Sequence, residues 1–156
     1  AYRLGDLNTE TIFVLEQAKT QAPDFLKTLT GDEKIILTDH NASSQSHPEL
    51  RYEQVTHIID HHSSDSIATK NPINMRFEPI CSTCSILYKM YRESGLEITD
   101  QMATLMLAGI LSDSLAFRSP TTTDEDHAIV EILADQLEIT DIQTYAKNMF
   151  DAKSNL

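Results

Sequence analysis

Three short apolar runs in this sequence end on carboxylates, imidazoles or both. The runs are IILTDHN at residues 35–41, HIIDHH at residues 57–62 and GILSDS at residues 109–114. Carboxylate oxygens and imidazole nitrogens bind divalent cations such as Mn²⁺ and Mg²⁺, and histidine also exchanges protons near neutral pH. Three such endings in one chain predict a shared metal site rather than three unrelated turns.

The residue types suggest different roles within that site. Asp39 and either Asp60 or its neighbour His61 are delivered from two strand ends. Of two adjacent histidines on a strand end, only one usually points at a given metal, so His62 is left to act as an acid or a phosphate ligand. Asp113 belongs to a helix that we predict to be buried, or to the terminus of that helix, where an uncompensated charge would cost on the order of several kcal/mol and a metal would remove that cost.

Each motif alone also has a structural interpretation. Aspartate favours turns, so DHN by itself is more typical of a turn or a helix cap than of a metal ligand. DHH after a β-branched run is more specific, and the three motifs together in this order favour the metal site. His47, His57 and His127 have no such neighbours and are predicted to be surface or core residues.

The cysteines of CSTC, residues 81–84, have the spacing of a redox motif at a predicted helix start. A helix N-terminus would lower a thiol pKa. Two cysteines cannot complete a four-ligand zinc site, however, and the residues between them are ordinary helix-cap formers. We therefore expect Cys81 and Cys84 to be small core residues.

The elements that must position these motifs alternate along the chain. Short apolar runs predict strands near residues 2–4, 34–38, 55–59 and 73–80. Strands of this kind, interspersed with helical patterns, predict an α/β fold with a Rossmann-like, mostly parallel sheet flanked by helices. Ligands of such sheets bind beyond the carboxyl ends of the strands, which is where DHN and DHH fall.

Helix starts are marked by capping residues. The first helix is expected to begin after Asn8 and to end at Pro23, with Ile12, Leu15 and Phe13 at its apolar positions. A capping box at Thr122 and Glu125 predicts another start. The remaining expected starts are at Ser82 or Thr83, at Thr99 or Asp100, and at residue 141.

Composition limits the class of partner. The 156 residues suit one domain with a substantial core, and they include 24 acidic and 12 basic residues, a formal net charge of −12. This balance argues against nucleic acid or an anionic membrane surface as a partner, since both attract clustered Lys and Arg. With no long apolar run and no signal-peptide pattern, we expect a cytoplasmic protein.

The motifs resemble those of the DHH phosphoesterases and, within them, the manganese-dependent (family II) inorganic pyrophosphatases. The similar segments are ILTDHN, HIIDHH and GILSDSLAFRSPTTTDED, supported by YRLGDLNTETIFVL and YAKNMFDAKSNL near the two ends. Together they cover nearly the whole chain. DHN placed 21 residues before DHH separates this resemblance from the nucleases and phosphodiesterases of the same superfamily.

The resemblance implies an enzyme that hydrolyses pyrophosphate to two phosphates. It implies two Mn²⁺ ions per active site, with Mg²⁺ or Co²⁺ as alternatives, and places Asp39 between the two ions. The implied ligands are Asp39, His61 and Asp113, with Asp60, His40 and Asn41 behind them, His62 as catalytic and phosphate-binding residue, and Arg118 as a further substrate contact.

The resemblance also implies a domain organisation. Residues 1–156 are expected to form a DHH domain without the family's first strand and its C-terminal substrate domain, and a homodimer is compatible with it. Two other functions stay open at this point. One is a phosphodiesterase acting on short oligonucleotides or cyclic dinucleotides, and the other is a non-catalytic fragment with residual metal binding.

Overall fold

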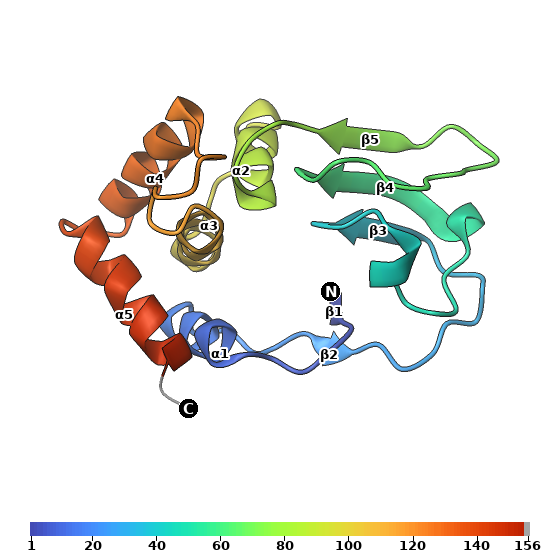
Figure 1. Cartoon of the computed structure of the whole chain (residues 1–156), viewed down its shortest axis with the longest axis horizontal. Coiled ribbons are helices and arrows are strands. Elements are labelled where there is room, and N and C mark those ends of the chain that lie inside the picture. Colours follow the sequence, from blue (N-terminus) through green and yellow to red (C-terminus); the bar gives the residue numbers. More distant parts are fainter. Residues whose placement is uncertain (155–156) are drawn as a thin grey trace. The chain divides into compact units, whose positions relative to one another are not determined.

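The chain forms two compact units in the computed structural model, which describes residues 1–154 (Figure 1). The strand unit comprises Ala1–Asp6 and Pro23–Pro79, and the helical unit comprises Leu7–Ala22 and the residues from Ile80 onward. Within residues 1–154, all five strands lie in the first unit and all five α-helices in the second. The α/β class expected from the sequence is confirmed.

The strand unit is built on a parallel sheet of three strands in the order β3-β4-β5. These are β3 (Ile35–Thr38), β4 (Val55–Asp60) and β5 (Asn74–Phe77), and a separate parallel pair joins β1 (Tyr2–Arg3) to β2 (Asp24–Phe25). Burial of apolar side chains on one face stabilises the sheet. The buried residues of this small core are Leu37, Val55 and Ile58, contacted by Ile35, Leu50, Tyr52, Ile67, Ile73 and Phe77.

The register of the sheet determines which residues emerge at its carboxyl edge. Thr38 pairs with Ile59, so β3 ends beside the penultimate residue of β4. The backbone N–H of Asp39 still donates to the Ile59 carbonyl at 2.9 Å. The DHN and DHH motifs therefore leave adjacent strands at the same level, as the sequence predicts.

The helical unit places one apolar helix among four others. Its α3 (Asp100–Asp113) is buried over most of its length, because alanine, leucine, isoleucine and methionine occupy nearly every side of it. The other helices are α1 (Thr9–Gln17), α2 (Thr83–Glu93), α4 (Asp124–Gln136) and α5 (Ile142–Ser154). Among residues 1–154, no helix is both long and apolar enough to cross a membrane.

Most predicted helix starts are confirmed, and two boundaries are wrong. Asn8, Ser82 and Thr99 each accept a hydrogen bond from a backbone N–H in the first turn of the helix that follows. The capping box of α4 is formed by Thr123 and Asp126, one residue later than predicted. The first helix ends well before Pro23, because its C-cap is followed by Lys19 in the left-handed region.

The predicted apolar face of α1 is confirmed at Phe13 but wrong at Ile12. Ile12 is exposed and Leu15 only half-buried, while Phe13 and Val14 contact the core.

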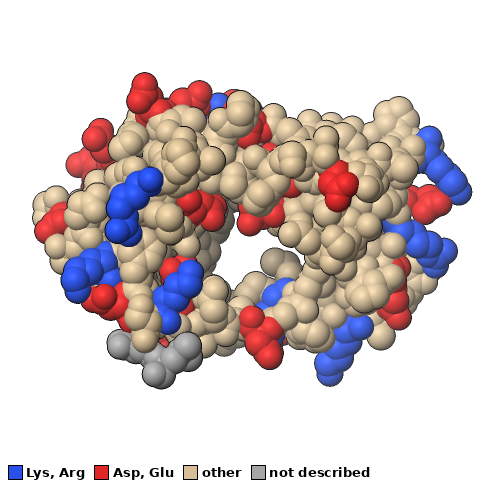
Figure 2. All heavy atoms as spheres, in the orientation of Figure 1, with Lys and Arg blue, Asp and Glu red and all other residues tan. Residues whose placement is uncertain are grey.

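On the face of the molecule shown in Figure 2, basic side chains lie among acidic ones and form no continuous patch.

The buried Asp126 carboxylate joins the first turn of α4 to the start of α2. Its Oδ2 accepts hydrogen bonds from Thr123 N and Oγ1, both at 2.8 Å, and from Cys81 N at 3.2 Å. Its Oδ1 accepts from Ser85 Oγ at 2.6 Å. Burial alone would raise the pKa of Asp126, but the hydrogen bonds from Ser85 and Thr123 outweigh burial and lower it.

We predict that Asp126→Asn destabilises the protein by about 2–3 kcal/mol at pH 7, because Asn replaces a charged acceptor of several buried donors. The folded pKa lies below the unfolded value of roughly 3.9, so this stabilisation is present above about pH 4 and is lost as pH falls further. Urea unfolding at pH 7 and pH 3 measures the difference, which should be smaller at pH 3. The exposed Asp124→Asn in the same turn is the control. A loss that is equal at both pH values would contradict the prediction.

Gly109 lets α3 approach α2 closely. A Cβ atom at this position would lie 2.4 Å from Cys84 Sγ and 3.3 Å from Cys84 Cβ. The first distance is far inside van der Waals contact, so any larger residue must displace the cysteine side chain.

We predict that Gly109→Ala destabilises the protein by about 1–2 kcal/mol, because overpacking outweighs the gain of roughly 1 kcal/mol in helix propensity. In a Cys84→Ala background the same substitution should be neutral or stabilising. A double-mutant cycle by urea unfolding measures this coupling. Equal effects of Gly109→Ala in both backgrounds would rule out the contact as the cause.

Candidate metal centre

Asp39 ends β3 in a left-handed conformation, with φ of 64°. Aspartate tolerates this region better than most residues because its short polar side chain can bond locally. The turn stops the strand directly after Thr38 and leaves the Asp39 side chain 56% exposed at the carboxyl edge of the sheet.

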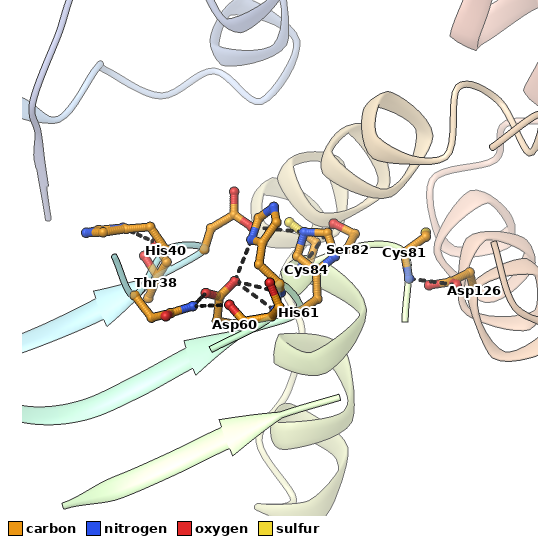
Figure 3. A network of polar contacts seen from close by, with 12 residues as sticks. Thr38, His40, Asp60, His61, Cys81, Ser82, Cys84 and Asp126 are labelled. Carbon is orange, nitrogen blue, oxygen red and sulfur yellow. Dashed lines mark hydrogen bonds and ion pairs between the residues drawn. The ribbon is translucent and has the colours of Figure 1, made fainter. Parts of the chain in front are cut away.

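Asp60 ends β4 and is fully buried. Its Oδ1 accepts hydrogen bonds from His61 N at 2.8 Å, His62 N at 3.2 Å and His62 Nδ1 at 2.7 Å, and its Oδ2 accepts from Asn41 Nδ2 at 2.7 Å. Burial would raise the pKa of Asp60, but these bonds, led by the one from Asn41, more than offset burial and lower it. Asp60 is therefore an anion whose hydrogen bonds fix the positions of His61 and His62 (Figure 3).

The four side chains at this edge form a compact cluster of potential metal ligands. Asp39, Asp60, His61 and His62 each offer one ligand atom, and these atoms all lie within 4.8 Å of one another. His61 Nε2 lies 3.3 Å from Asp39 Oδ1, slightly beyond the usual N–H···O range of about 2.7–3.2 Å. Adjacent ligands of an octahedral ion with bonds of ~2.1 Å lie ~3 Å apart, so this pair fits a shared cation.

Asn41 connects the turns that follow β3 and β4. It is 2% exposed, and its Nδ2 also donates to the Ser63 carbonyl at 3.0 Å, while its Oδ1 accepts from Asp65 N at 2.7 Å. The Tyr52 hydroxyl donates to the Asn41 carbonyl at 3.0 Å. Sequence reasoning missed Tyr52, because its contact spans eleven residues and no motif surrounds it.

His40 is not brought into the cluster. Its Nδ1 lies 3.0 Å from the Thr38 carbonyl, and its Nε2 is buried with no hydrogen-bond partner among the described residues (Figure 3). The ring contacts the backbone of its own strand end. A role for His40 in supporting the metal ligands, without itself binding the metal, stays a prediction.

Asp113 and Arg118 lie in the helical unit. Asp113 is the last residue of α3, so its expected place at a helix terminus is confirmed, but it is exposed and the expectation that its charge is buried is wrong. The helix ends at this position and its buried face stops before it. Arg118 is also exposed, and its Nε donates to the Leu115 carbonyl at 2.9 Å. The roles of Asp113 as metal ligand and of Arg118 as substrate contact stay predictions.

The interpretation of Cys81 as a core residue is confirmed. Cys81 is 1% exposed, and burial, followed by the hydrogen bond and charge of Asp126, raises the pKa of its thiol. Figure 3 shows the backbone of Cys81 bonded to Asp126. A protonated, buried thiol is a poor nucleophile, which agrees with the interpretation of Cys81 as a core residue.

Comparisons with known proteins agree with the motifs. Residues 5–110 match the model of the DHH family, N-terminal domain. Over all 156 residues, the chain is 47% identical to a protein of Deinococcus radiodurans named "probable manganese-dependent inorganic pyrophosphatase", and it covers 50% of that protein. Proteins of the same name from Staphylococcus carnosus and Staphylococcus aureus JH9 are 41% and 43% identical over 152 residues, with 49% of each covered.

A solved structure is also similar. It is a crystal structure from Methanococcus jannaschii of a protein assigned to the family II inorganic pyrophosphatases, with a TM-score of 0.90 and 33% identity. The match covers 97% of this chain and 52% of that one. The chain thus spans about half the length of the curated relatives it matches.

We predict that Asn41→Asp destabilises the protein in a pH-dependent manner. The new carboxylate would lie about where Nδ2 lies now, 2.7 Å from Asp60 Oδ2, and two carboxylates at that distance cannot both ionise. One of the pair then has a raised folded pKa, so stability is retained at low pH and falls as pH rises through that value.

Urea unfolding in the presence of EDTA at pH 5 and pH 8 measures this effect. The loss at pH 8 should exceed the loss at pH 5 by at least about 1 kcal/mol, the equivalent of roughly one pKa unit. The control, Asn41→Ala, removes the same donor without adding charge and should lose similar stability at both pH values. A pH-independent loss in Asn41→Asp would contradict the assigned contact.

Proposed function

Because the chain belongs to the DHH family, we propose that its cluster at the carboxyl edge of the sheet binds manganese for the hydrolysis of inorganic pyrophosphate. The observation that carries the proposal is the convergence of Asp39, Asp60, His61 and His62 from two adjacent strand ends. The names of the relatives supply the metal and the substrate. The reaction breaks one phosphoanhydride bond with one water and yields two phosphates.

Asp39 and His61 are the proposed ligands in the strand unit. Asp60 already accepts four hydrogen bonds, so it is better suited to hold its neighbours than to bind an ion. A carboxylate with an imidazole suits Mn²⁺ well. A second ion in the same site, and Asp113 as a further ligand, extend this proposal from the sequence motifs.

When bound, manganese supplies Lewis-acid stabilisation of phosphate charge and a more acidic water. The chain itself contributes the orientation of His62. Asp60 is an anion that can only accept, so His62 Nδ1 must carry a proton, and Nε2 is the nitrogen that remains for the substrate. The His62 side chain is 55% exposed, which leaves room for a phosphate.

His62 is proposed to bind and protonate phosphate oxygen. With Nε2 protonated, the imidazolium donates to a phosphate oxygen and offsets negative charge as the bond to the leaving phosphate breaks. Arg118 is proposed as a second contact, because guanidinium groups pair with phosphate in a bidentate manner. Cytoplasmic location and a homodimer stay predictions.

We predict that Asp39→Asn in the natural protein raises the dissociation constant for Mn²⁺ and lowers the rate of pyrophosphate hydrolysis by at least about tenfold, because a charged ligand is lost. His62→Gln should preserve metal affinity within about twofold and lower kcat by roughly 100-fold. Manganese binding is measured by electron paramagnetic resonance and phosphate release by a colorimetric assay.

His57→Gln is the matched control, since His57 lies on the same strand and bonds Thr56 and Asn74 outside the cluster. It should leave metal affinity and turnover unchanged. Unaltered metal binding in Asp39→Asn would refute the proposed site. Mononucleotide release from a dinucleotide, without phosphate release from pyrophosphate, would instead identify a phosphodiesterase.

A further inference from the structure

Asp113 lies between two serines that are both anchored. Ser114 is fully buried, its Oγ accepts a hydrogen bond from Phe117 N at 3.2 Å, and its carbonyl accepts from Ser119 N at 2.8 Å. On the other side, Ser112 Oγ donates to Glu10 Oε1 in α1. The exposed Asp113 carboxylate is thus carried by a backbone that is fixed both before and after it.

The segment after α3 is held in an unusual conformation. Leu115, Ala116 and Phe117 have φ values of 51°, 52° and 69°, and none of them is glycine. Three consecutive left-handed residues are unfavourable for L-amino acids and persist only where neighbouring contacts determine them. The Leu115 and Ala116 N–H groups donate back to Ser112 and Leu111 carbonyls at 3.1 and 2.9 Å, so the turn is built on the last turn of the helix.

Glu10 is a buried acidic residue of α1 that contacts the end of α3 through Ser112. It is 8% exposed, and it lies in the first turn of α1, where the helix dipole favours an anion. Its Oε2 has no hydrogen-bond partner among the described residues, and Lys153 Nζ in α5 forms a long ion pair with it at 4.0 Å. A buried carboxylate with one unsatisfied oxygen is costly, which argues that its bond to Ser112 serves a purpose beyond stability.

We propose that Glu10 is a positioning residue for Asp113, acting through the Ser112 hydroxyl. The inference rests on the proposed role of Asp113 as a metal ligand. The Glu10–Ser112 bond ties the last turn of α3 to α1. The buried Ser114 hydroxyl accepts from Phe117 N and so holds the left-handed turn that follows. Together they direct the Asp113 carboxylate, and ligands directed in this way hold a metal more tightly than ligands whose support is lost.

Mn²⁺ binding to the natural protein tests this inference without relying on turnover. Ser112→Ala and Glu10→Ala should each raise the dissociation constant about tenfold, a size typical of residues that orient a ligand. The double variant should be no weaker than either single variant, because both remove one bond. Glu10→Gln keeps an acceptor for Ser112 and should bind within about twofold of the original protein.

Lys153→Ala is the matched control, because Lys153 lies near the same carboxylate but outside its bond to Ser112. It should leave metal affinity unchanged. Hydrogen exchange of the Leu115–Phe117 amides in metal-free protein should accelerate in Ser112→Ala and Glu10→Ala but not in Lys153→Ala. Urea midpoints measured in parallel separate loss of positioning from general destabilisation.

Unchanged metal affinity in Ser112→Ala overturns the positioning role, even if the variant is less stable. Asp113→Asn and Asp39→Asn distinguish the positioning role of Glu10 from the metal-binding roles of Asp113 and Asp39. Weaker binding in Asp113→Asn with normal binding in Ser112→Ala removes only the positioning role. Normal binding in Asp113→Asn removes the ligand role of Asp113 and the positioning role with it, whereas Asp39→Asn independently tests the cluster in the strand unit.

Discussion

The carboxyl edge of the sheet depends on one buried anion, Asp60. Water is excluded from it, so its charge is tolerated only because four N–H donors surround it. Two of these donors are the backbone amides of His61 and His62, which forces the chain to turn back over the end of β4. The same turn brings His61 Nε2 to 3.3 Å from Asp39 Oδ1 and His62 Nδ1 to 2.7 Å from Asp60 Oδ1. The positions of both histidines therefore follow from satisfying one carboxylate.

The parallel order of the strands makes this arrangement possible. In a parallel sheet all strands end at the same edge, and the pairing of Thr38 with Ile59 brings DHN level with DHH. Asp39 then needs a left-handed backbone to leave the strand, and Asn41 reaches across to Asp60. Short-range conformation and strand pairing thus act on the same few residues, and neither would form the cluster alone.

The sequence predicts those features that depend on local patterns. Strand runs, the caps Asn8, Ser82 and Thr99, and the meeting of DHN with DHH all follow from spacing and from the geometry of parallel strands. The start of α4 could not be predicted in this way. Both candidate capping boxes fit the local pattern, and the choice is made by donors 41 and 45 residues away, at Ser85 and Cys81.

Two features of the site were inaccessible from the sequence for the same reason. Tyr52 contributes through a single long-range hydrogen bond to a backbone carbonyl, which leaves no trace in residue spacing. The exposure of Asp113 depends on where α3 ends, and the apolar pattern before it suggested burial. The left-handed residues that follow are ordinary leucine, alanine and phenylalanine, so nothing in their types indicates the turn.

The acidic residues of this chain fall into two groups that differ in burial. Asp60 and Asp126 are buried, and each accepts several hydrogen bonds that fix a strand end or a helix end. Asp39 and Asp113, to which the ligand roles are assigned, are exposed. This division has a physical basis, because a buried carboxylate saturated by donors has little capacity left for a cation, whereas an exposed one can exchange water for a metal. Neutralising Asp60 or Asp126 should therefore act first on folding, and neutralising Asp39 or Asp113 should act first on metal affinity.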